Sequence, residues 1–183
     1  MTFGKLLALV IGLLERSGIP YMVTGSLASS YHGEPRATRD ADIVIDPSRE
    51  ALDRLTAGLL EAGFYVDRDV AREAFAGRSQ FNAIGPDALK VDFMIRRDRP
   101  FSVEEFRRRE PADLLGTPGF VATAEDVILA KLEWAKATGS DRQLDDVAGI
   151  LASASGLDLS YVDRWAAILG VEDAWRAIRE EAR

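Results

Sequence analysis

Two aspartates, Asp40 and Asp42, lie two residues apart at the start of an apolar run that reads "DADIVID". Side chains alternate between the two faces of a strand, so both carboxylates would project to one side while Ala41 and Ile43 project into a core. Like charges this close repel and raise each other's pKa. A solvent-exposed strand end or a bound divalent cation would offset that repulsion, and both interpretations stay open at this point.

A third carboxylate occurs in a second apolar run, "LKVDFMI", where Asp92 is flanked by Val91 and Phe93. An acid in the middle of a strand is unfavourable unless it has a partner. Asp92 is therefore either the partner of a basic side chain or, if its strand lies beside the Asp40 strand, the third member of a carboxylate cluster.

Gly25 and Ser26 close one apolar run and open a short helical segment. A glycine followed by a small hydroxyl residue at a strand-to-helix turn lets backbone N–H groups face an anion, and the start of a helix favours negative charge. Alone, this pair is more typical of a helix cap than of a binding site.

Together, the turn and the three acids fit one chemical task. They would hold a nucleoside triphosphate on two magnesium ions for in-line attack at phosphorus, because Mg²⁺ prefers oxygen ligands and uses few carboxylates together with substrate phosphates. A site in which the acids hold a purely structural ion is a further, less favoured alternative.

The elements that must position these residues can be predicted from apolar periodicity and from turn residues. Helices are expected at residues 2–16, 26–33 and 48–62 and, with breaks, from 123 almost to the end. Strands are expected at residues 20–24 and 40–46, beginning at 64–66, and as a hairpin at 79–84 and 89–95, while residues 116–120 are expected to form a turn. We therefore predict an α/β (α+β) fold, with a mixed β-sheet flanked by helices in residues 1–120 and a helical C-terminal part in residues 121–183.

Composition narrows the class of protein. The chain has 183 residues, no cysteine and a net charge of −7. The absence of cysteine excludes disulfides and thiolate metal sites and fits a cytoplasmic protein. The negative charge argues against non-specific coating of nucleic acid. The apolar stretch at residues 6–14 is too short to span a bilayer, so no membrane association is expected.

The sequence resembles the DNA polymerase β-like nucleotidyltransferase superfamily, and within it the AbiEii-like minimal nucleotidyltransferases found in bacterial toxin–antitoxin pairs. The resemblance rests on "GS" after a strand, on "HGEPRATRDADIVI" and "KVDFM", and on "EDVILAKLEWAKATGSDRQLDDVAGIL". It covers residues 20–46, 88–96 and 123–152.

The resemblance implies a role for each matching residue. Gly25 and Ser26 would hold the triphosphate, and Asp40 and Asp42 would bind the metal ions. Asp92 would be a further metal ligand or a general base for the acceptor hydroxyl.

The third block adds residues on the later helices. Lys131 would contact phosphate or the leaving group, and Arg142, Asp145 and Asp146 match the arginine and the acidic pair of the family pattern.

Other residues have two interpretations each. Arg36 and Arg39 either neutralise phosphates or balance Asp40 and Asp42. His32, the one histidine, either touches a substrate or packs and caps locally. The run at residues 107–109 is either a solvated helix face or an RNA-contacting patch, and Trp134, Trp165 and Trp175 are expected to pack the C-terminal helices.

Two functional hypotheses follow. The chain is an enzyme that transfers NMP from an NTP to the hydroxyl of an unidentified acceptor (a tRNA end, a protein side chain or a small molecule), with a toxin role and an antitoxin partner implied by the resemblance. Alternatively, it keeps the fold with weak or no chemistry and acts as a binding partner.

Overall fold

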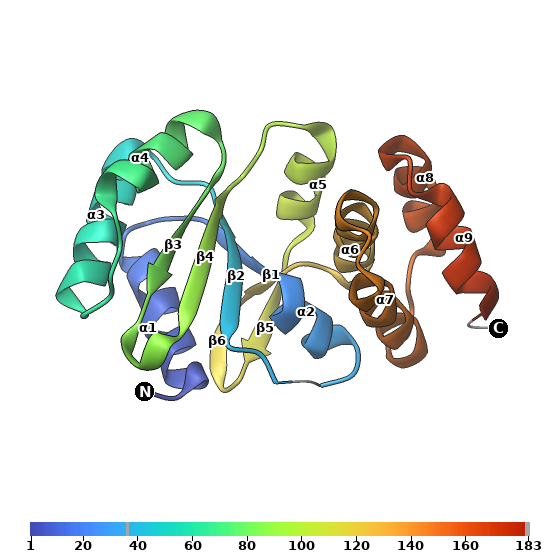
Figure 1. The fold of residues 1–183 in the computed structure, drawn as a ribbon, viewed down its shortest axis with the longest axis horizontal. Coiled ribbons are helices and arrows are strands. Elements are labelled where there is room, and N and C mark those ends of the chain that lie inside the picture. Colours follow the sequence, from blue (N-terminus) through green and yellow to red (C-terminus); the bar gives the residue numbers. More distant parts are fainter. Residues whose placement is uncertain (36, 182–183) are drawn as a thin grey trace.

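The structure, a computed structural model, describes residues 1–35 and 37–181 (Figure 1). The α-helices of this part are α1 (Phe3–Arg16), α2 (Gly25–His32), α3 (Arg49–Glu61), α4 (Arg68–Gly77), α5 (Pro100–Arg108), α6 (Ala124–Thr138), α7 (Asp141–Ser153), α8 (Leu159–Leu169) and α9 (Glu172–Glu181). The strands are β1 (Tyr21–Thr24), β2 (Asp40–Ile45), β3 (Gln80–Ile84), β4 (Lys90–Ile95), β5 (Glu110–Leu114) and β6 (Thr117–Val121), and a 3-10 turn spans Pro86–Ala88.

The strands form one mixed sheet in the order β3-β4-β2-β1-β6-β5. β2 runs parallel to β4 and antiparallel to β1, and β3–β4 and β5–β6 are antiparallel hairpins. The helices α1, α3 and α4 lie on one side of the sheet and α2, α6 and α7 on the other (Figure 1). The predicted α/β fold is confirmed.

One face of the central strands builds the core. Alternate residues of β2 and β4, including Ala41, Ile43, Val91 and Phe93, have no solvent-accessible surface and pack in one cluster with the apolar side of α1. The period-2 pattern in the sequence therefore sets which side chains of each strand remain on the opposite face.

Two local predictions were wrong. The strand expected from Phe64 is reduced to one bridge, between Tyr65 and Ile84, because Asp67 caps a helix, α4, directly afterwards by accepting hydrogen bonds from the N–H groups of Asp69 and Val70. The turn expected at residues 116–120 is instead β6, which pairs with β5 on one side and with β1 through Val23 and Val121 on the other. Pairing with the neighbouring strand β5 and with the distant strand β1 overrides the local preference of the Pro and Gly residues of β6.

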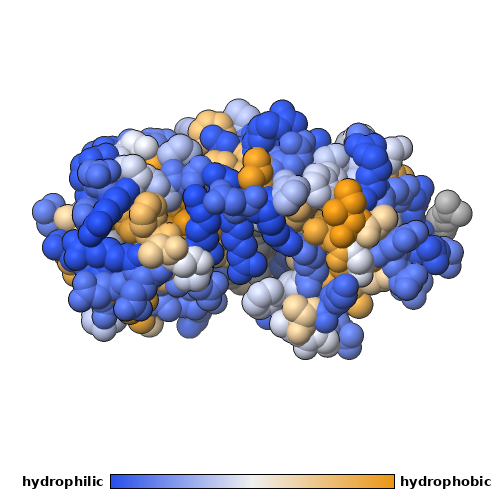
Figure 2. All heavy atoms as spheres, turned by 90° about the horizontal axis from the view of Figure 1, so that it is seen from above, coloured by the Kyte–Doolittle hydropathy of each residue, from blue (hydrophilic) through white to orange (hydrophobic). Residues whose placement is uncertain are grey.

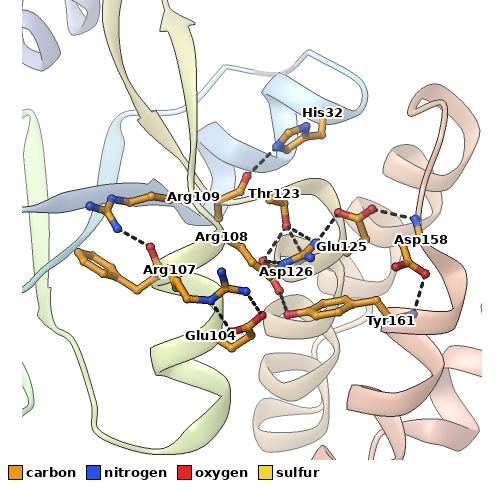
Figure 3. Close-up of polar contacts among 12 residues, drawn as sticks. His32, Glu104, Arg107, Arg108, Arg109, Thr123, Glu125, Asp126, Asp158 and Tyr161 are labelled. Carbon is orange, nitrogen blue, oxygen red and sulfur yellow. Dashed lines mark hydrogen bonds and ion pairs between the residues drawn. The ribbon is translucent and has the colours of Figure 1, made fainter.

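The C-terminal helices are joined to α5 by a buried polar network around Asp126, whose side chain is 0% exposed (Figure 3). Its carboxylate accepts hydrogen bonds from Tyr161 (2.6 Å), Thr123 (2.7 Å) and Arg108 (3.1 Å). The Arg108 guanidinium also lies 3.8 Å from the centre of the Tyr161 ring. Burial, together with the bond to Asp126, raises the pKa of Tyr161.

This network corrects the expectation of a solvated or RNA-contacting arginine run. Arg107 is exposed and pairs with Glu104, but Arg108 is held by Asp126, and Arg109 stacks on Phe106. Two of the three guanidinium groups are therefore committed to internal contacts.

Two of the three tryptophans are packed among the C-terminal helices or against α5, and the third is exposed. Trp175 is 2% exposed and donates its indole N–H to Asp163, and Trp165 packs against Phe101 of α5, as expected. Trp134 is 59% exposed, so the expectation that it packs the C-terminal helices was wrong.

The remaining surface has ordinary character. Figure 2 shows that the side at the top of Figure 1 is mainly hydrophilic, with hydrophobic residues in separate patches. Singly exposed apolar residues such as Val103 and Ile168 are normal in folded proteins. Within residues 1–35 and 37–181, every helix is too short or too polar to span a lipid bilayer.

Replacing Asp126 with Ala is expected to lower the free energy of unfolding by about 3–5 kcal/mol, because Arg108 and the Tyr161 hydroxyl lose their buried partner. Urea denaturation measures this, with Asp173→Ala as the control, since Asp173 is almost fully exposed beside Arg176 and its loss is expected to change stability by less than about 0.5 kcal/mol. A small effect of Asp126→Ala would contradict the role of the network.

The free energy of unfolding is also expected to fall as the pH rises from the ordinary pKa of a glutamate to the raised pKa of Glu105. Burial, with the charge of Asp126, raises the pKa of Glu105 from 4.5 to about 8. Folded chains therefore keep a proton that unfolded chains release, so the free energy of unfolding decreases between these two values. Urea melts across this range measure the decrease, which Glu105→Gln is expected to reduce.

Glu104→Gln is the matched control for Glu105, because its hydrogen bond with Arg107 lowers the pKa of Glu104. Its melts are expected to keep the wild-type decrease. A Glu105→Gln protein with an unchanged pH profile would show that Glu105 does not govern this dependence.

Candidate active site

The three predicted acids lie on one face of the sheet, opposite the core. In the parallel pairing of β2 with β4, Asp42 is in register with Asp92, and Asp40 with Lys90. Register partners on neighbouring strands point to the same side, and the alternate residues Ala41 and Val91 are buried on the other. The carboxylates of Asp42 and Asp92 are thus neighbours, with Asp40 one strand step away.

The start of α2 closes over this pair. Gly25 has φ +62°, and a Cβ placed there would lie 2.0 Å from Oδ2 of Asp42. Only glycine permits both this backbone conformation and this close approach. The backbone N–H of Ser26 donates a hydrogen bond to Asp42.

Thr24, at the N-cap of α2, makes no side-chain capping bond. The first turn of α2 therefore presents backbone donors to the acids and to any anion bound beside them.

Negative charge is in excess at this point. Burial raises the pKa of Asp42, and the charges of Asp92 and Asp40 raise it further, against the lowering effects of the Ser26 N–H and of Lys131. An added cation would lower it again, because an opposite charge favours the ionised carboxylate.

Two lysines partly supply this positive charge. Nζ of Lys90 lies 2.8 Å from Oδ2 of Asp92, and this hydrogen bond raises the pKa of Lys90. Lys131 is buried on α6, where its Nζ donates to Oδ2 of Asp146 at 2.7 Å. The charge of Lys131 lowers the pKa of Asp42, while its hydrogen-bond partner is Asp146 of α7, to which the sequence assigned no role.

The other predicted residues lie at the edge of this cluster or away from it. Arg39 is exposed next to Asp40, and Arg142 and Asp145 are exposed on α7. Arg36 lies outside the described residues. His32 donates from Nε2 to the carbonyl oxygen of Ala122 at 2.7 Å (Figure 3), which is the packing role that was weighed against substrate contact.

Sequence reasoning missed Lys90 and Thr24. Lys90 precedes Asp92 by two residues, and this alternation already places the two on one face. Thr24 faces Asp42 across the antiparallel β1–β2 pair, a register that local sequence does not reveal.

Several solved protein structures share the fold of this chain. The lincosamide antibiotic adenylyltransferase LnuA, solved with lincomycin bound, has a TM-score of 0.56 and 11% identity over 82% of this chain and 96% of its own. A nucleotidyltransferase-like antigenic protein from Paracoccidioides brasiliensis has a TM-score of 0.60 and 17% identity, over 96% of this chain and 91% of its own. This chain has the nucleotidyltransferase fold.

The antibiotic-resistance factor ANT(2'')-Ia shares the fold as well. Its crystal structure, solved with adenylyl-2''-tobramycin, has a TM-score of 0.63 and 15% identity over 93% of this chain and 98% of its own. No protein-family model matches the chain and no curated protein is significantly similar to it. The narrower AbiEii-like assignment therefore stays a prediction.

The residues that this nucleotidyltransferase fold brings together fit a magnesium ion in their chemistry. Among residues 1–35 and 37–181, no three acidic or histidine side chains are grouped closely enough to hold an ion by themselves. Mg²⁺, however, is usually bound by one or two carboxylates together with substrate phosphates and water. The neighbouring oxygens of Asp42 and Asp92 match that arrangement.

The close approach of Gly25 to Asp42 predicts a specific effect of substitution. Gly18→Ala is the matched control, because Gly18 has φ +69° with no atom within 4 Å of an added Cβ. It is expected to lower the free energy of unfolding by about 1–2 kcal/mol, the backbone term alone. Gly25→Ala is expected to lose a further ~1–3 kcal/mol, because the methyl group must displace the Asp42 carboxylate. Urea denaturation compares the two, and equal losses would contradict the close approach.

Proposed function

We propose that this chain is a metal-dependent nucleotidyltransferase that transfers NMP from an NTP to an acceptor hydroxyl. The observation that carries the proposal is the register of the parallel strands β2 and β4, which places Asp42 directly beside Asp92, next to the uncapped start of α2. Backbone N–H groups that can bind phosphate and a pair of carboxylates therefore lie next to each other, on the face of the sheet opposite the core.

Each residue has a role in this proposal. Gly25 and the N–H groups of the first turn of α2 bind the triphosphate, with the Ser26 hydroxyl beside them. Lys131 neutralises part of the negative charge of the phosphates, because its own charge already lowers the pKa of the neighbouring Asp42. Arg39 and Arg142, both exposed, contact the outer phosphates.

The acids hold the metal and manage the proton. Asp40, Asp42 and Asp92 would hold up to two Mg²⁺ ions, which when bound supply neutralisation of the phosphate charge. Asp92 accepts the proton of the acceptor hydroxyl as its oxygen forms a bond to the α-phosphorus. The bond from that phosphorus to the bridging oxygen breaks, and diphosphate leaves. Positioning and charge neutralisation supply most of the rate enhancement.

We further propose that the acceptor is a small hydroxyl compound. LnuA and ANT(2'')-Ia were solved with antibiotic compounds, lincomycin and an adenylylated tobramycin. The net charge of −7 and the internal pairing of Arg108 disfavour a long polyanion as acceptor. Transfer to tRNA or to a protein side chain would overturn this part of the proposal.

The remaining parts of the proposal concern context. Residues 1–120 form the nucleotidyltransferase core and residues 121–183 a helical part that contributes Lys131. A cytoplasmic location and a toxin role with an antitoxin partner complete it. Arrest of cell growth on expression of the wild type, but not of an Asp42→Asn variant, would support the toxin role, and normal growth with both would contradict it.

The alternative, a binding protein with weak chemistry, is favoured by one observation. Lys90 already neutralises Asp92, and Asp146 already neutralises Lys131, so the site is partly charge-balanced without substrate. An active enzyme must exchange the Lys90 contact for a metal contact when the substrate binds.

A transfer assay tests the proposal. Protein, each α-labelled NTP and Mg²⁺ are combined with pools of small hydroxyl compounds, tRNA or protein, and label on the acceptor is measured. Asp42→Asn and Asp92→Asn are each expected to lower transfer at least about 100-fold. Asp53→Asn is the charge-matched control, because Asp53 lies on α3 paired with Arg72 and is expected to leave transfer unchanged.

Thermal stability gives a second readout for the same variants. Asp42→Asn removes a carboxylate whose charged form is disfavoured by burial and by Asp92, so its melting temperature without metal is expected to be equal to or higher than that of the wild type. Absence of transfer with every acceptor, together with no stabilisation of the wild type by Mg²⁺ and NTP, would favour the binding protein.

A further inference from the structure

Trp134 is a large aromatic side chain without a structural task. Its side chain is 59% exposed, whereas Trp175 is 2% exposed and Trp165 packs on Phe101. Among residues 1–35 and 37–181, its indole has neither a hydrogen-bond partner nor a ring contact, and only its carbonyl oxygen is engaged, by Thr138. Tryptophan combines a large flat apolar ring with a polar N–H, and for this reason it is enriched where a protein contacts a ligand or a partner.

The contacts of α6 define which way Trp134 points. On one side of the helix, Glu133 makes a two-pronged ion pair with Arg99, at 2.7 and 2.6 Å, which ties α6 to the start of α5. On the other side, Lys131 binds Asp146 of α7. Figure 1 shows α6 between α5 and α7, on the same side of the sheet as α2.

Helical geometry places Trp134 in the sector between these two contacts. At 3.6 residues per turn, it lies about 60° around the helix from Lys131 and about 4.5 Å further along the axis. Val127, seven residues earlier on the same stripe, is buried in the core. α6 contacts α2, whose first residue, Gly25, closes on Asp42, and both helices lie on the same side of the sheet. The sector of α6 that carries Lys131 and Trp134 is therefore on the side of the sheet that holds the carboxylates.

We propose that the Trp134 indole stacks on the base of the bound nucleotide. This inference rests on the proposed function, in which the phosphates lie between the start of α2 and Lys131. Trp134 lies about 4.5 Å along α6 beyond Lys131, and in this proposal the base extends from the phosphates along α6 toward it. Stacking on an aromatic side chain is worth about 1–3 kcal/mol per base, a factor of roughly 5 to 150 in affinity, and every base has a π face.

The base is favoured over the acceptor as the occupant because of where each must lie. The acceptor hydroxyl gives its proton to Asp92, and in-line attack places it opposite the leaving diphosphate. Trp134 lies on the Lys131 side of the site instead. Recognition by stacking also implies that the chain accepts several NTPs, with purines bound more tightly than pyrimidines.

Calorimetric titration with two ligands tests the stacking. Mg²⁺·ATP carries both phosphates and base, while Mg²⁺·tripolyphosphate carries phosphates alone. Trp134→Ala is expected to weaken ATP binding about 10-fold or more and to leave tripolyphosphate binding unchanged, whereas Trp134→Phe retains most of the ATP affinity. Ile168→Ala, which truncates an exposed apolar side chain on α8, is the matched control and is expected to bind both ligands as the wild type does.

Tryptophan fluorescence supplies a direct readout of contact. ATP is expected to quench the wild-type emission, and most of this quenching is expected to be lost in Trp134→Phe, because the other two indoles are packed inside. Tripolyphosphate is expected to quench neither protein.

The outcomes separate this inference from the proposed function. Equal ATP affinity in the wild type and Trp134→Ala overturns the stacking and leaves the proposed function standing. A wild type that binds neither ATP nor tripolyphosphate overturns both. Quenching by acceptor compounds without nucleotide would assign Trp134 to the acceptor and overturn the assignment to the base.

Discussion

The register between β2 and β4 is the constraint on which the site depends, because it sets the carboxylates of Asp42 and Asp92 side by side on the face of the sheet opposite the core. The core side of the same strands holds this register in place, since Ile43 and Phe93 are fully buried, and a one-residue slip would turn every carboxylate inward. The backbone of Gly25 then closes on Asp42 so tightly that no side chain fits between them. Hydrophobic burial on one face thus maintains a charged and unfavourable arrangement on the other.

The helices α6 and α7 add charged side chains to the site. The charge of Lys131 on α6 lowers the pKa of Asp42, while Asp146 of α7 binds the same ammonium group. The direction of α6 is fixed by the buried network around Asp126 and by the pair between Arg99 and Glu133. The same fixed direction leaves the Trp134 side chain exposed on α6. Stability of the helical part and geometry of the site are therefore linked through one helix.

Much of this could be predicted from the sequence, and most of the failures share a cause. Alternation within "DADIVID" and "LKVDFMI" determines which residues share a face, so the placement of Asp40, Asp42 and Asp92 follows from local pattern once the strands are paired. The pairing itself is non-local, which is why the pairing of β6 with β1 does not follow from local pattern. Arg108 and Trp134 were misjudged for the same reason, because burial of a helix residue depends on which helices lie beside it. The contact between Lys90 and Asp92 is local, and the alternation that places both on one face does not by itself show that they bond.

A crystal structure with a non-hydrolysable ATP analogue and Mn²⁺ in place of Mg²⁺ would test the central claim most directly. We expect anomalous density between the carboxylates of Asp42 and Asp92, the phosphates at the first turn of α2, and the Lys90 ammonium moved away from Asp92. Nucleotide bound elsewhere, for example in the cavity lined by Phe3, Leu27 and Tyr31, with Lys90 still bonded to Asp92 and no metal between the acids, would contradict it.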